Sequence, residues 1–222
     1  MTKFYAIILA GGKGIRMNNT IPKQFLTLHG KPVLIHTIEK FASISELDIE
    51  IIVVLAKEQK EQWKTICNKH NFSIPHTIVD GGEERFYSVK NGLNAINEPG
   101  IVAIHDGVRP LVSKDVIIRS FKTAEERGSA LPVIPITESI RKKKTDRTIS
   151  VPRSKYIIVQ TPQTFSTNTV IEAYKQKYSL NFTDDASVVE STDYNITLIT
   201  GNKENIKLTT EVDFVIAEAL LK

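Results

Sequence analysis

Glycines and cations are concentrated in one stretch near the N-terminus, LAGGKGIRMNNTIPKQ at residues 9–24. The stretch holds three closely spaced glycines: Gly11, Gly12 and Gly14. A backbone without side chains lets a ligand approach its N–H groups closely. Arg16 adds a rigid, forked cation, and Lys23 adds a second one on the bend set by Pro22. Because bare amides and cations both bind anionic oxygen, the stretch predicts a site for a polyphosphate.

Two well-known glycine motifs do not fit this stretch. A P-loop requires Gly-x-x-x-x-Gly-Lys-[Ser/Thr], and no window of the chain supplies it. A dinucleotide-binding fingerprint ends on a small residue, whereas counting from Gly12 places Met17 there. The glycines alone would also fit a plain turn between a strand and a helix. Arg16 together with Pro22-Lys23-Gln24 favours the functional interpretation.

A repeated order of strand and helix patterns must position this stretch. Apolar runs predict strands at residues 4–10, 49–55, 77–79, 101–104, 130–136 and 196–199. Amphipathic periodicity predicts helices at residues 33–42, 58–70, 84–96, 114–127, 168–176, 184–190 and 210–221. The alternation predicts the α/β class, with a three-layer, Rossmann-like sandwich around a mostly parallel sheet.

The alternation breaks at residues 137–160. Two short strands, 139–141 and 149–151, are predicted on either side of a hydrophilic turn. An insertion of this length with a polar tip is typical of an exposed arm or a lid. No repeat, low-complexity tract or linker interrupts the rest of the sequence. We therefore expect one domain, residues 1–222, from which a β-arm protrudes at about 137–160.

Polar residues follow several of the predicted strands. These groups are 80–85 (DGGEER), 105–110 (HDGVRP), 161–163 (TPQ), 183–185 (TDD) and 205–207 (NIK). Ligands of open α/β sheets bind beyond the carboxyl ends of the strands, where such groups converge. The sequence thus predicts one polar site at that edge of the sheet.

Each of these groups also has a structural alternative. Gly81 and Gly82 either form a plain turn or leave backbone groups within reach of a nucleobase. Asp106 either caps the following segment or holds a ribose hydroxyl or a magnesium ion. We interpret Arg109 as a structural ion-pair partner and His105 as a buried, hydrogen-bonded histidine of the core.

Composition limits the classes of protein to consider. With 222 residues, 41% of them hydrophobic, the chain can bury one substantial core. A net charge of +4 fits an anionic small substrate as well as nucleic acid, but the one basic run, 141–144, is short and is interpreted as a solvated turn. Cys67 is the only cysteine, which excludes an internal disulfide and suits a reducing compartment. The sequence has neither an apolar leader nor a run of membrane-spanning length. We expect a cytoplasmic protein without a membrane or nucleic-acid partner.

The polar groups fall into seven motifs. They are Leu-Ala-Gly-Gly-x-Gly-x-Arg-Met from Leu9, Pro-Lys-Gln from Pro22, Gly-Gly-Glu-x-Arg-x-x-Ser from Gly81, His-Asp-Gly-x-Arg-Pro from His105, Gln-Thr-Pro-Gln-x-Phe from Gln160, Thr-Asp-Asp-Ala-Ser from Thr183 and Asn-Ile-Lys-x-Thr from Asn205. Together they resemble the 2-C-methyl-D-erythritol 4-phosphate cytidylyltransferase family, a branch of the sugar-nucleotide pyrophosphorylase superfamily. The resemblance spans essentially the whole chain in the family's order. It implies a fold of the nucleotide-diphospho-sugar transferase type.

The resemblance also implies roles for individual residues. CTP would be bound by Ala10, Gly11, Gly12, Gly14, Gly81, Gly82, Glu83, Ser88 and Asp106. The sugar phosphate would be bound by Ser139, Arg153, Thr183 and Lys207. The catalytic residues would be Arg16, Lys23, Arg153 and Lys207. Mg²⁺ is the implied cofactor, with Asp106 as its candidate ligand. In this family the arm reaches into a second subunit, which implies a homodimer with Ser139 and Arg153 acting across the interface.

Two positions depart from the family's usual pattern. Ser139 stands where a threonine is common, and its retained hydroxyl should preserve the contact with substrate. Gly11 stands where many members carry alanine, a departure shared with ribitol-phosphate enzymes.

The function that the resemblance implies is transfer of CMP from CTP to methylerythritol phosphate, in non-mevalonate isoprenoid biosynthesis. The same chemistry with ribitol 5-phosphate as acceptor is an alternative. A non-catalytic nucleotide-binding protein is a more distant one, and the presence of both Arg16 and Lys23 speaks against it. A nucleic-acid-binding protein ranks last because no aromatic residues are interleaved with the basic run.

Overall fold

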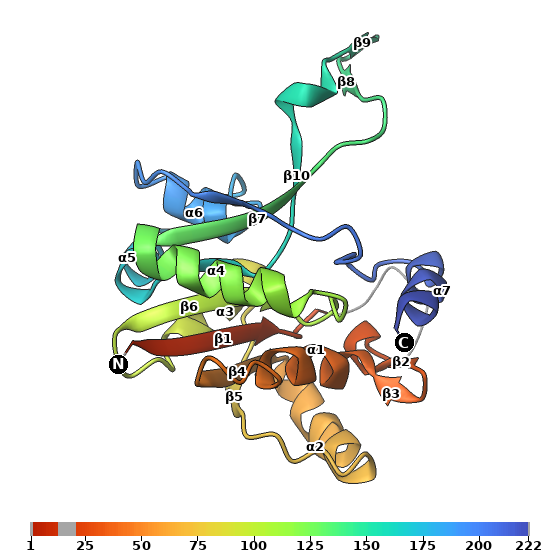
Figure 1. The fold of residues 1–222 in the computed structure, drawn as a ribbon, viewed down its shortest axis with the longest axis vertical. Coiled ribbons are helices and arrows are strands. Elements are labelled where there is room, and N and C mark those ends of the chain that lie inside the picture. Colours follow the sequence, from red (N-terminus) through yellow and green to blue (C-terminus); the bar gives the residue numbers. More distant parts are fainter. Residues whose placement is uncertain (1, 13–20, 222) are drawn as a thin grey trace.

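A mixed, mostly parallel sheet forms the centre of the protein, of which the computed structural model describes residues 2–12 and 21–221 (Figure 1). The strands lie in the order β10-β7-β11-β6-β1-β4-β5, and β12 pairs with β7. Their bounds are β1 Lys3–Leu9, β4 Ile49–Leu55, β5 Thr77–Asp80, β6 Gly100–Asp106, β7 Ser129–Pro135, β10 Ile157–Val159, β11 Gln163–Ser166 and β12 Leu198–Thr200. Among these, β10 and β11 run antiparallel to their neighbours. The predicted mostly parallel sheet is confirmed.

Helices cover both faces of the sheet because its central strands are apolar on both sides. One face is covered by α1 (Val33–Ala42), α2 (Lys60–Lys69) and α4 (Lys114–Arg127). The opposite face is covered by α3 (Arg85–Leu93), α5 (Thr167–Ala173) and α6 (Asp185–Glu190). Within β4, Ile51 and Val53 join the first core, while Ile52 and Val54 join the second. This alternation gives the predicted three layers.

A smaller core joins the two ends of the chain. The hairpin of β2 (Thr27–Leu28) and β3 (Lys31–Pro32) packs against α7 (Glu211–Leu220). Leu28, Val33, Leu208 and Ala217 are buried together there. Short 3₁₀ turns lie at Lys23–Phe25, Lys57–Gln59 and Arg153–Lys155. The first of these turns contains Lys23 and is followed directly by the hairpin.

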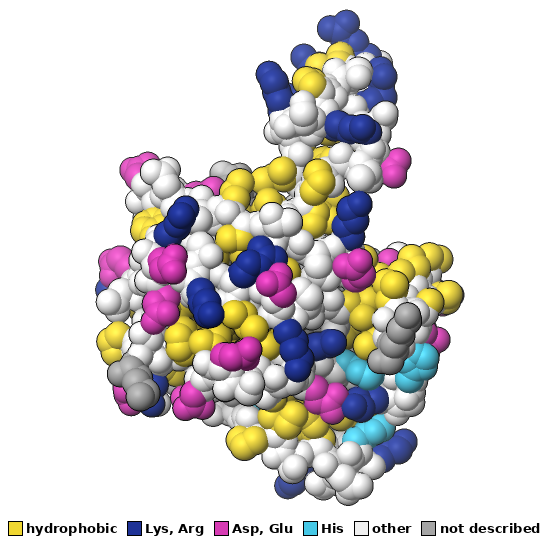
Figure 2. All heavy atoms as spheres, in the orientation of Figure 1, with side chains coloured by type: hydrophobic (Ala, Val, Ile, Leu, Met, Phe, Trp, Pro, Cys, Tyr) yellow, Lys and Arg dark blue, Asp and Glu magenta, His cyan; other side chains and the backbone are white. Residues whose placement is uncertain are grey.

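The arm comprises residues 136–156, between β7 and β10, and projects away from the sheet (Figure 1). Its own strands, β8 (Arg141–Lys143) and β9 (Thr148–Ser150), are shifted by one or two residues from the predicted ones. Exposed basic side chains crowd it (Figure 2): Arg141, Lys142, Lys143, Lys144, Arg147, Arg153 and Lys155. Over the described part of the chain, no helix is long and apolar enough to cross a membrane.

Two strands of the central sheet, β10 and β11, were absent from the sequence prediction, as was the short β2–β3 hairpin. The sequence of β11, QTFS, shows little apolar character, and its burial comes from lying between β6 and β7. The apolar run of β10 follows the arm directly, so its return to the sheet has no local signal. Both strands are fixed by tertiary pairing rather than by their own patterns.

Candidate functional site

The carboxyl ends of β1 and β6 lie side by side at the edge of the sheet. Leu9 at the end of β1 pairs with Val54 on one side and with Asp106 on the other. The chain order along the sheet reverses here, because β4 follows on one side of β1 and β6 on the other. Such a reversal is where open α/β sheets bind their ligands.

The segment containing Lys23 is attached to the end of β1 through Gln24. The buried Gln24 amide donates to the carbonyl oxygen of Ala10 and, at 2.9 Å, to Oε1 of Gln59. The half-buried Lys23 donates its ammonium to the carbonyl oxygen of Thr209 at 2.8 Å. Gly11 and Gly12 follow shortly after β1, and a Cβ added at Gly12 would have no contact within 4 Å among the described residues. Gly14 and Arg16 lie outside the described residues.

Asp106 is nearly buried and faces three cations. Its Oδ2 lies 3.1 Å from Nζ of Lys207 and 3.2 Å from Nε of Arg109, while its Oδ1 lies 3.8 Å from Nε of Arg85. Burial alone would raise the pKa of this carboxyl, but the three cations outweigh it and hold the pKa well below its usual range. The ion pair confirms the interpretation of Arg109 as a structural partner. Arg85 also pairs with Asp185, so the three cations face two carboxylates, and the excess positive charge suits an anionic ligand.

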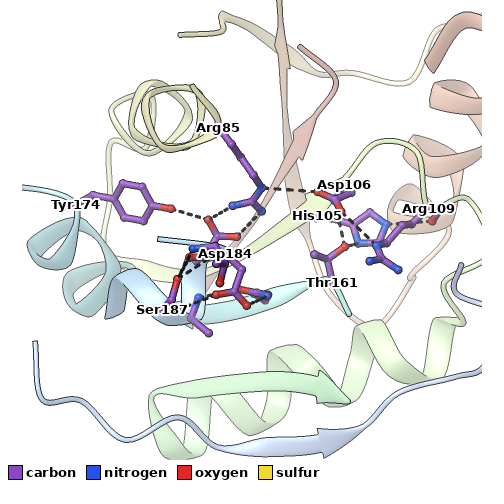
Figure 3. A network of polar contacts seen from close by, with 12 residues as sticks. Arg85, His105, Asp106, Arg109, Thr161, Tyr174, Asp184 and Ser187 are labelled. Atoms are coloured by element: carbon purple, nitrogen blue, oxygen red, sulfur yellow. Dashed lines mark hydrogen bonds and ion pairs between the residues drawn. The ribbon is translucent and has the colours of Figure 1, made fainter. Parts of the chain in front are cut away.

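Arg85 joins this cluster to α6 through a buried ion pair (Figure 3). Its guanidinium donates to both oxygens of Asp185, at 2.7 and 2.6 Å, and Asp185 has no exposed surface. The hydroxyl of Tyr174 donates to the same carboxylate at 2.6 Å. Burial, followed by the charge of Asp185, raises the pKa of Tyr174, so the hydroxyl keeps its proton. For Arg85, burial lowers the pKa and the charge of Asp185 raises it, leaving it above the usual value.

His105 is a fully buried, hydrogen-bonded histidine of the core, as predicted. Its Nδ1 lies 3.0 Å from Oγ1 of Thr161, and its Nε2 lies 3.1 Å from the carbonyl oxygen of Arg109. Oγ1 of Thr161 also accepts from the N–H of Asp106 at 3.1 Å. Because the carbonyl oxygen of Arg109 can only accept, Nδ1 is the ring nitrogen without a proton, and it accepts from the Thr161 hydroxyl. Nε2 then carries the ring proton and donates to Arg109. Burial lowers the pKa of His105 to about 4, which keeps the ring neutral at physiological pH.

This buried histidine predicts a pH dependence of stability. The pKa of His105 is about 4 in the folded protein and about 6.5 when unfolded, so between these values the unfolded chain binds more protons. Stability should therefore fall as the pH decreases from about 6.5 towards 4, by up to ~1.4 kcal/mol per pH unit. Urea unfolding of the wild type and of His105→Gln across this range measures the effect. A variant with the same pH slope as the wild type would contradict the assignment.

The loop predicted to hold the cytosine is internally hydrogen-bonded. The N–H of Gly81 donates to the carbonyl oxygen of Leu55 at 2.7 Å, and the N–H of Gly82 donates to Oγ of Ser88 at 3.0 Å. A Cβ added at Gly82 would collide with Tyr87, so only glycine fits there. Glu83 is exposed beside it. The structure thus brings Ser88 to the paired glycines, as the motif requires.

Thr183 directly precedes Asp184, the N-cap of α6, and lines the same cavity as Arg85. Its N–H donates to Oγ of Ser187 at 3.0 Å, within the capping box formed by Asp184 and Ser187. Gln163 fixes this corner by donating to Asp184 and accepting from the N–H of Ala186. A cavity of about 120 Å³ is lined by Glu84, Arg85, Phe86, Tyr174, Tyr178, Phe182, Thr183, Asp184 and Val188.

Ser139 and Arg153 lie on the arm, away from this cluster. Both are exposed, and Arg153 donates to the carbonyl oxygen of Thr137 within the arm itself. Because the arm projects from the sheet, one chain does not bring these residues together with Asp106 (Figure 1).

Sequence reasoning missed the residues that connect the loops: Arg85, Thr161, Asp185 and Asn205. No role was assigned to Arg85 from the sequence, yet its guanidinium ties α3 to α6. Asn205 is fully buried, donates to the carbonyl oxygen of Thr161 at 2.7 Å and accepts from Arg109 through its own carbonyl. The only available signal was that all four lie inside the quoted motifs.

The fold and this site define a nucleotidyltransferase-type α/β protein. Solved structures with the same architecture include the cytidyl synthase of Anaerococcus prevotii, "4-diphosphocytidyl-2C-methyl-D-erythritolsynthase" (TM-score 0.84, 26% identity, 99% of this chain and 96% of that one). The 2-C-methyl-D-erythritol 4-phosphate cytidylyltransferase of Francisella tularensis is similar as well (TM-score 0.81, 30% identity, 99% and 100% covered).

Sequence comparison gives the family. The model of the family described as "2-C-methyl-D-erythritol 4-phosphate cytidylyltransferase" (IspD) matches residues 4–222. The proteins of this name from Azobacteroides pseudotrichonymphae (50% identity, all of both chains) and Bacteroides fragilis (49% identity, 97% of this chain and 98% of that one) are similar throughout. The chain therefore belongs to the 2-C-methyl-D-erythritol 4-phosphate cytidylyltransferase family, and it is a nucleotidyltransferase.

Proposed function

We propose that this enzyme transfers CMP from CTP to 2-C-methyl-D-erythritol 4-phosphate, giving 4-diphosphocytidyl-2-C-methyl-D-erythritol and pyrophosphate, in non-mevalonate isoprenoid biosynthesis. The observation that carries the proposal is the set of cations around Asp106 at the ends of β1 and β6. The names of the relatives supply the substrates. None of the relatives named above supports ribitol phosphate as the acceptor or a non-catalytic role.

The reaction would be an in-line displacement at phosphorus. A phosphate oxygen of the acceptor attacks the α-phosphorus of CTP, the bond from that phosphorus to the bridging oxygen breaks, and pyrophosphate leaves with the bond electrons. The acceptor phosphate is already ionised at neutral pH, so no enzyme nucleophile or base is required. Catalysis then depends on positioning and on cations that face the developing charge.

The cations divide between the two substrates. Lys23 and Arg16 would hold the triphosphate, and Lys207 would hold the acceptor phosphate next to Asp106. Asp106 would keep Lys207 and Arg109 in place and face the ribose. The remaining CTP contacts would come from the backbone after β1 and from the loop carrying Gly82 and Ser88.

Mg²⁺ is the cofactor that this chemistry implies. Among residues 2–12 and 21–221, no group of three or more His, Cys, Asp or Glu could hold a metal alone. Mg²⁺ commonly binds through one or two carboxylates together with substrate phosphates, and the donor set here fits that pattern. Asp106 would be the carboxylate that holds it, together with oxygens of the substrate phosphates. When bound, the ion would neutralise charge on the phosphates.

A homodimer would complete the acceptor site. Ser139 and Arg153 are exposed on the projecting arm, and this supports their use by another molecule. We propose that they reach the acceptor of a second copy, next to its Thr183 and Lys207. The single, half-buried Cys67 agrees with a reducing, cytoplasmic location.

Replacing Arg153 by alanine should raise the KM for the acceptor by about tenfold or more, the scale of one charged hydrogen bond. The KM for CTP should change little, because the arm would touch only the acceptor. Arg147→Ala on the same arm is the matched control. Steady-state kinetics with each substrate varied measures both constants. An unchanged acceptor KM in Arg153→Ala would make Arg153 a structural residue.

The acceptor is tested by comparing kcat/KM for methylerythritol 4-phosphate and ribitol 5-phosphate, with CTP and Mg²⁺ saturating. Strong preference for the first would support the proposal. Preference for ribitol phosphate would keep the chemistry and overturn the acceptor.

A further inference from the structure

At the start of α7, one carboxylate oxygen accepts three hydrogen bonds. Thr210 is the N-cap of this helix, and Asp213 completes a capping box with it. A capping box links the side chain at the third helical position to the N-cap N–H. Here Oδ2 of Asp213 accepts that bond from Thr210 at 2.7 Å, and it also accepts from the N–H and the hydroxyl of Thr209 at 2.7 and 2.8 Å. Two of the three bonds therefore restrain a residue that lies outside the helix.

Thr209 is the residue whose carbonyl oxygen receives Lys23. The ammonium of Lys23 donates to this oxygen at 2.8 Å, across a sequence separation of 186 residues. The preceding Leu208 is fully buried and donates its N–H to the carbonyl oxygen of Val108 at 2.9 Å. Before it comes Lys207, which pairs with Asp106. Residues 207–209 thus contact Asp106 through Lys207 and Lys23 through Thr209. Asp213 holds the Thr209 end of this segment.

We propose that Asp213 is a positioning residue for Lys23, acting by fixing the carbonyl oxygen of Thr209 against which the ammonium rests. The inference rests on the proposed function, because it gives Lys23 a task at the triphosphate. Asp213 touches neither substrate nor the reacting atoms.

Two observations make this arrangement rigid. Hydrogen bonds to an ionised acceptor are shorter and stronger than neutral ones, and these bonds hold the pKa of Asp213 below its usual value although burial opposes them. The helix itself is held at its other end, where Nε2 of His29 donates to the carbonyl oxygens of Glu218 and Leu221. Ala217 packs between these ends in the core shared with Leu28.

Asp213→Asn should release this restraint while keeping the shape of the side chain. A neutral amide oxygen in the place of Oδ2 is a weaker acceptor for the same three donors. The Thr209 carbonyl would then move, and a misplacement of about 1 Å can cost about 10²-fold in rate. We expect an intermediate effect, with kcat lowered roughly tenfold. Glu211→Gln is the matched control, because it removes the same charge from the first turn of the same helix and leaves the bonds between Asp213 and Thr209 in place.

Two measurements test the inference. The first is the rate of acylation of the Lys23 amine by acetic anhydride, followed peptide by peptide in the free enzyme. Asp213→Asn should accelerate acylation of Lys23 severalfold over the wild type, and Glu211→Gln should not. Equal rates in the two variants would overturn the proposal. This readout is independent of enzyme activity, so it would still decide the contact if the wild type released no pyrophosphate, a result that overturns the proposed function.

The second measurement is a double-substitution cycle in kcat with Lys23→Ala. If Asp213 acts through Lys23, Asp213→Asn should cost much less in the Lys23→Ala background than in the wild type. A full additional loss in that background would assign Asp213 a merely structural role. Melting temperatures of Asp213→Asn and Glu211→Gln that agree closely would exclude global unfolding as the cause of the kcat difference.

Discussion

Lys23→Ala should lower the turnover of the enzyme by at least ~100-fold, the scale of removing one preorganised charge donor from a transition state. Lys23 follows the stiff Pro22, and its neighbour Gln24 is bonded to the end of β1, so the ammonium is held where a triphosphate at that edge would lie. The loss should appear mainly in kcat, because the charge on the transferring group grows in the transition state. Steady-state pyrophosphate release measures it.

The control for this prediction is Lys31→Ala. Lys31 lies on the adjacent hairpin and forms an exposed pair with Glu39 at 2.8 Å. Exposed pairs contribute little to stability, so this variant should keep nearly full activity. Turnover of Lys23→Ala equal to that of Lys31→Ala would remove Lys23 from the mechanism.

Asp185→Asn should have the largest effect on stability, lowering the free energy of unfolding by about 3–5 kcal/mol, the usual cost of breaking a buried ion pair from one side. Asp185 is fully buried and takes both guanidinium bonds of Arg85 together with the hydroxyl of Tyr174. Without its charge, Arg85 would remain partly buried with no full countercharge. Urea unfolding at neutral pH measures the difference.

Two variants with smaller expected losses of stability serve as controls. Tyr174→Phe removes only one of the three bonds and should cost about 1 kcal/mol. Asp115→Asn removes an exposed carboxylate paired with Arg119 at 2.8 Å and should leave stability nearly unchanged. If Asp185→Asn were as stable as Asp115→Asn, the ion pair would not hold α3 and α6 together.

The layers of the fold followed from local patterns. The continuous aliphatic run of β4 and the amphipathic α1 and α4 are determined by residues adjacent in sequence, so periodicity located them to within a residue. The polar segment 161–166 could not be assigned in this way. The burial of this segment depends on its pairing with β6 and β7, and on the hydrogen bonds that Gln163 forms with Asp184 and Thr161 forms with Asn205.

The site residues show the same difference between local signals and contacts with distant residues. Lys23, Asp106 and Lys207 were predicted from residue type and motif, and the structure places the last two in direct contact. Asp185 lies inside a quoted motif and Asp213 lies outside all of them, but an acidic residue near the start of a helix is ordinary, so neither was singled out. Their importance comes from the distant groups they hold, Arg85 and Thr209.

The most direct test of the proposed reaction is phosphorus NMR of a mixture of the wild-type enzyme, CTP, Mg²⁺ and 2-C-methyl-D-erythritol 4-phosphate. Transfer of CMP predicts loss of the acceptor's phosphomonoester signal, with equimolar gain of a diester diphosphate and of pyrophosphate. Persistence of the phosphomonoester, with CTP either intact or merely hydrolysed, would contradict cytidylyl transfer to this acceptor.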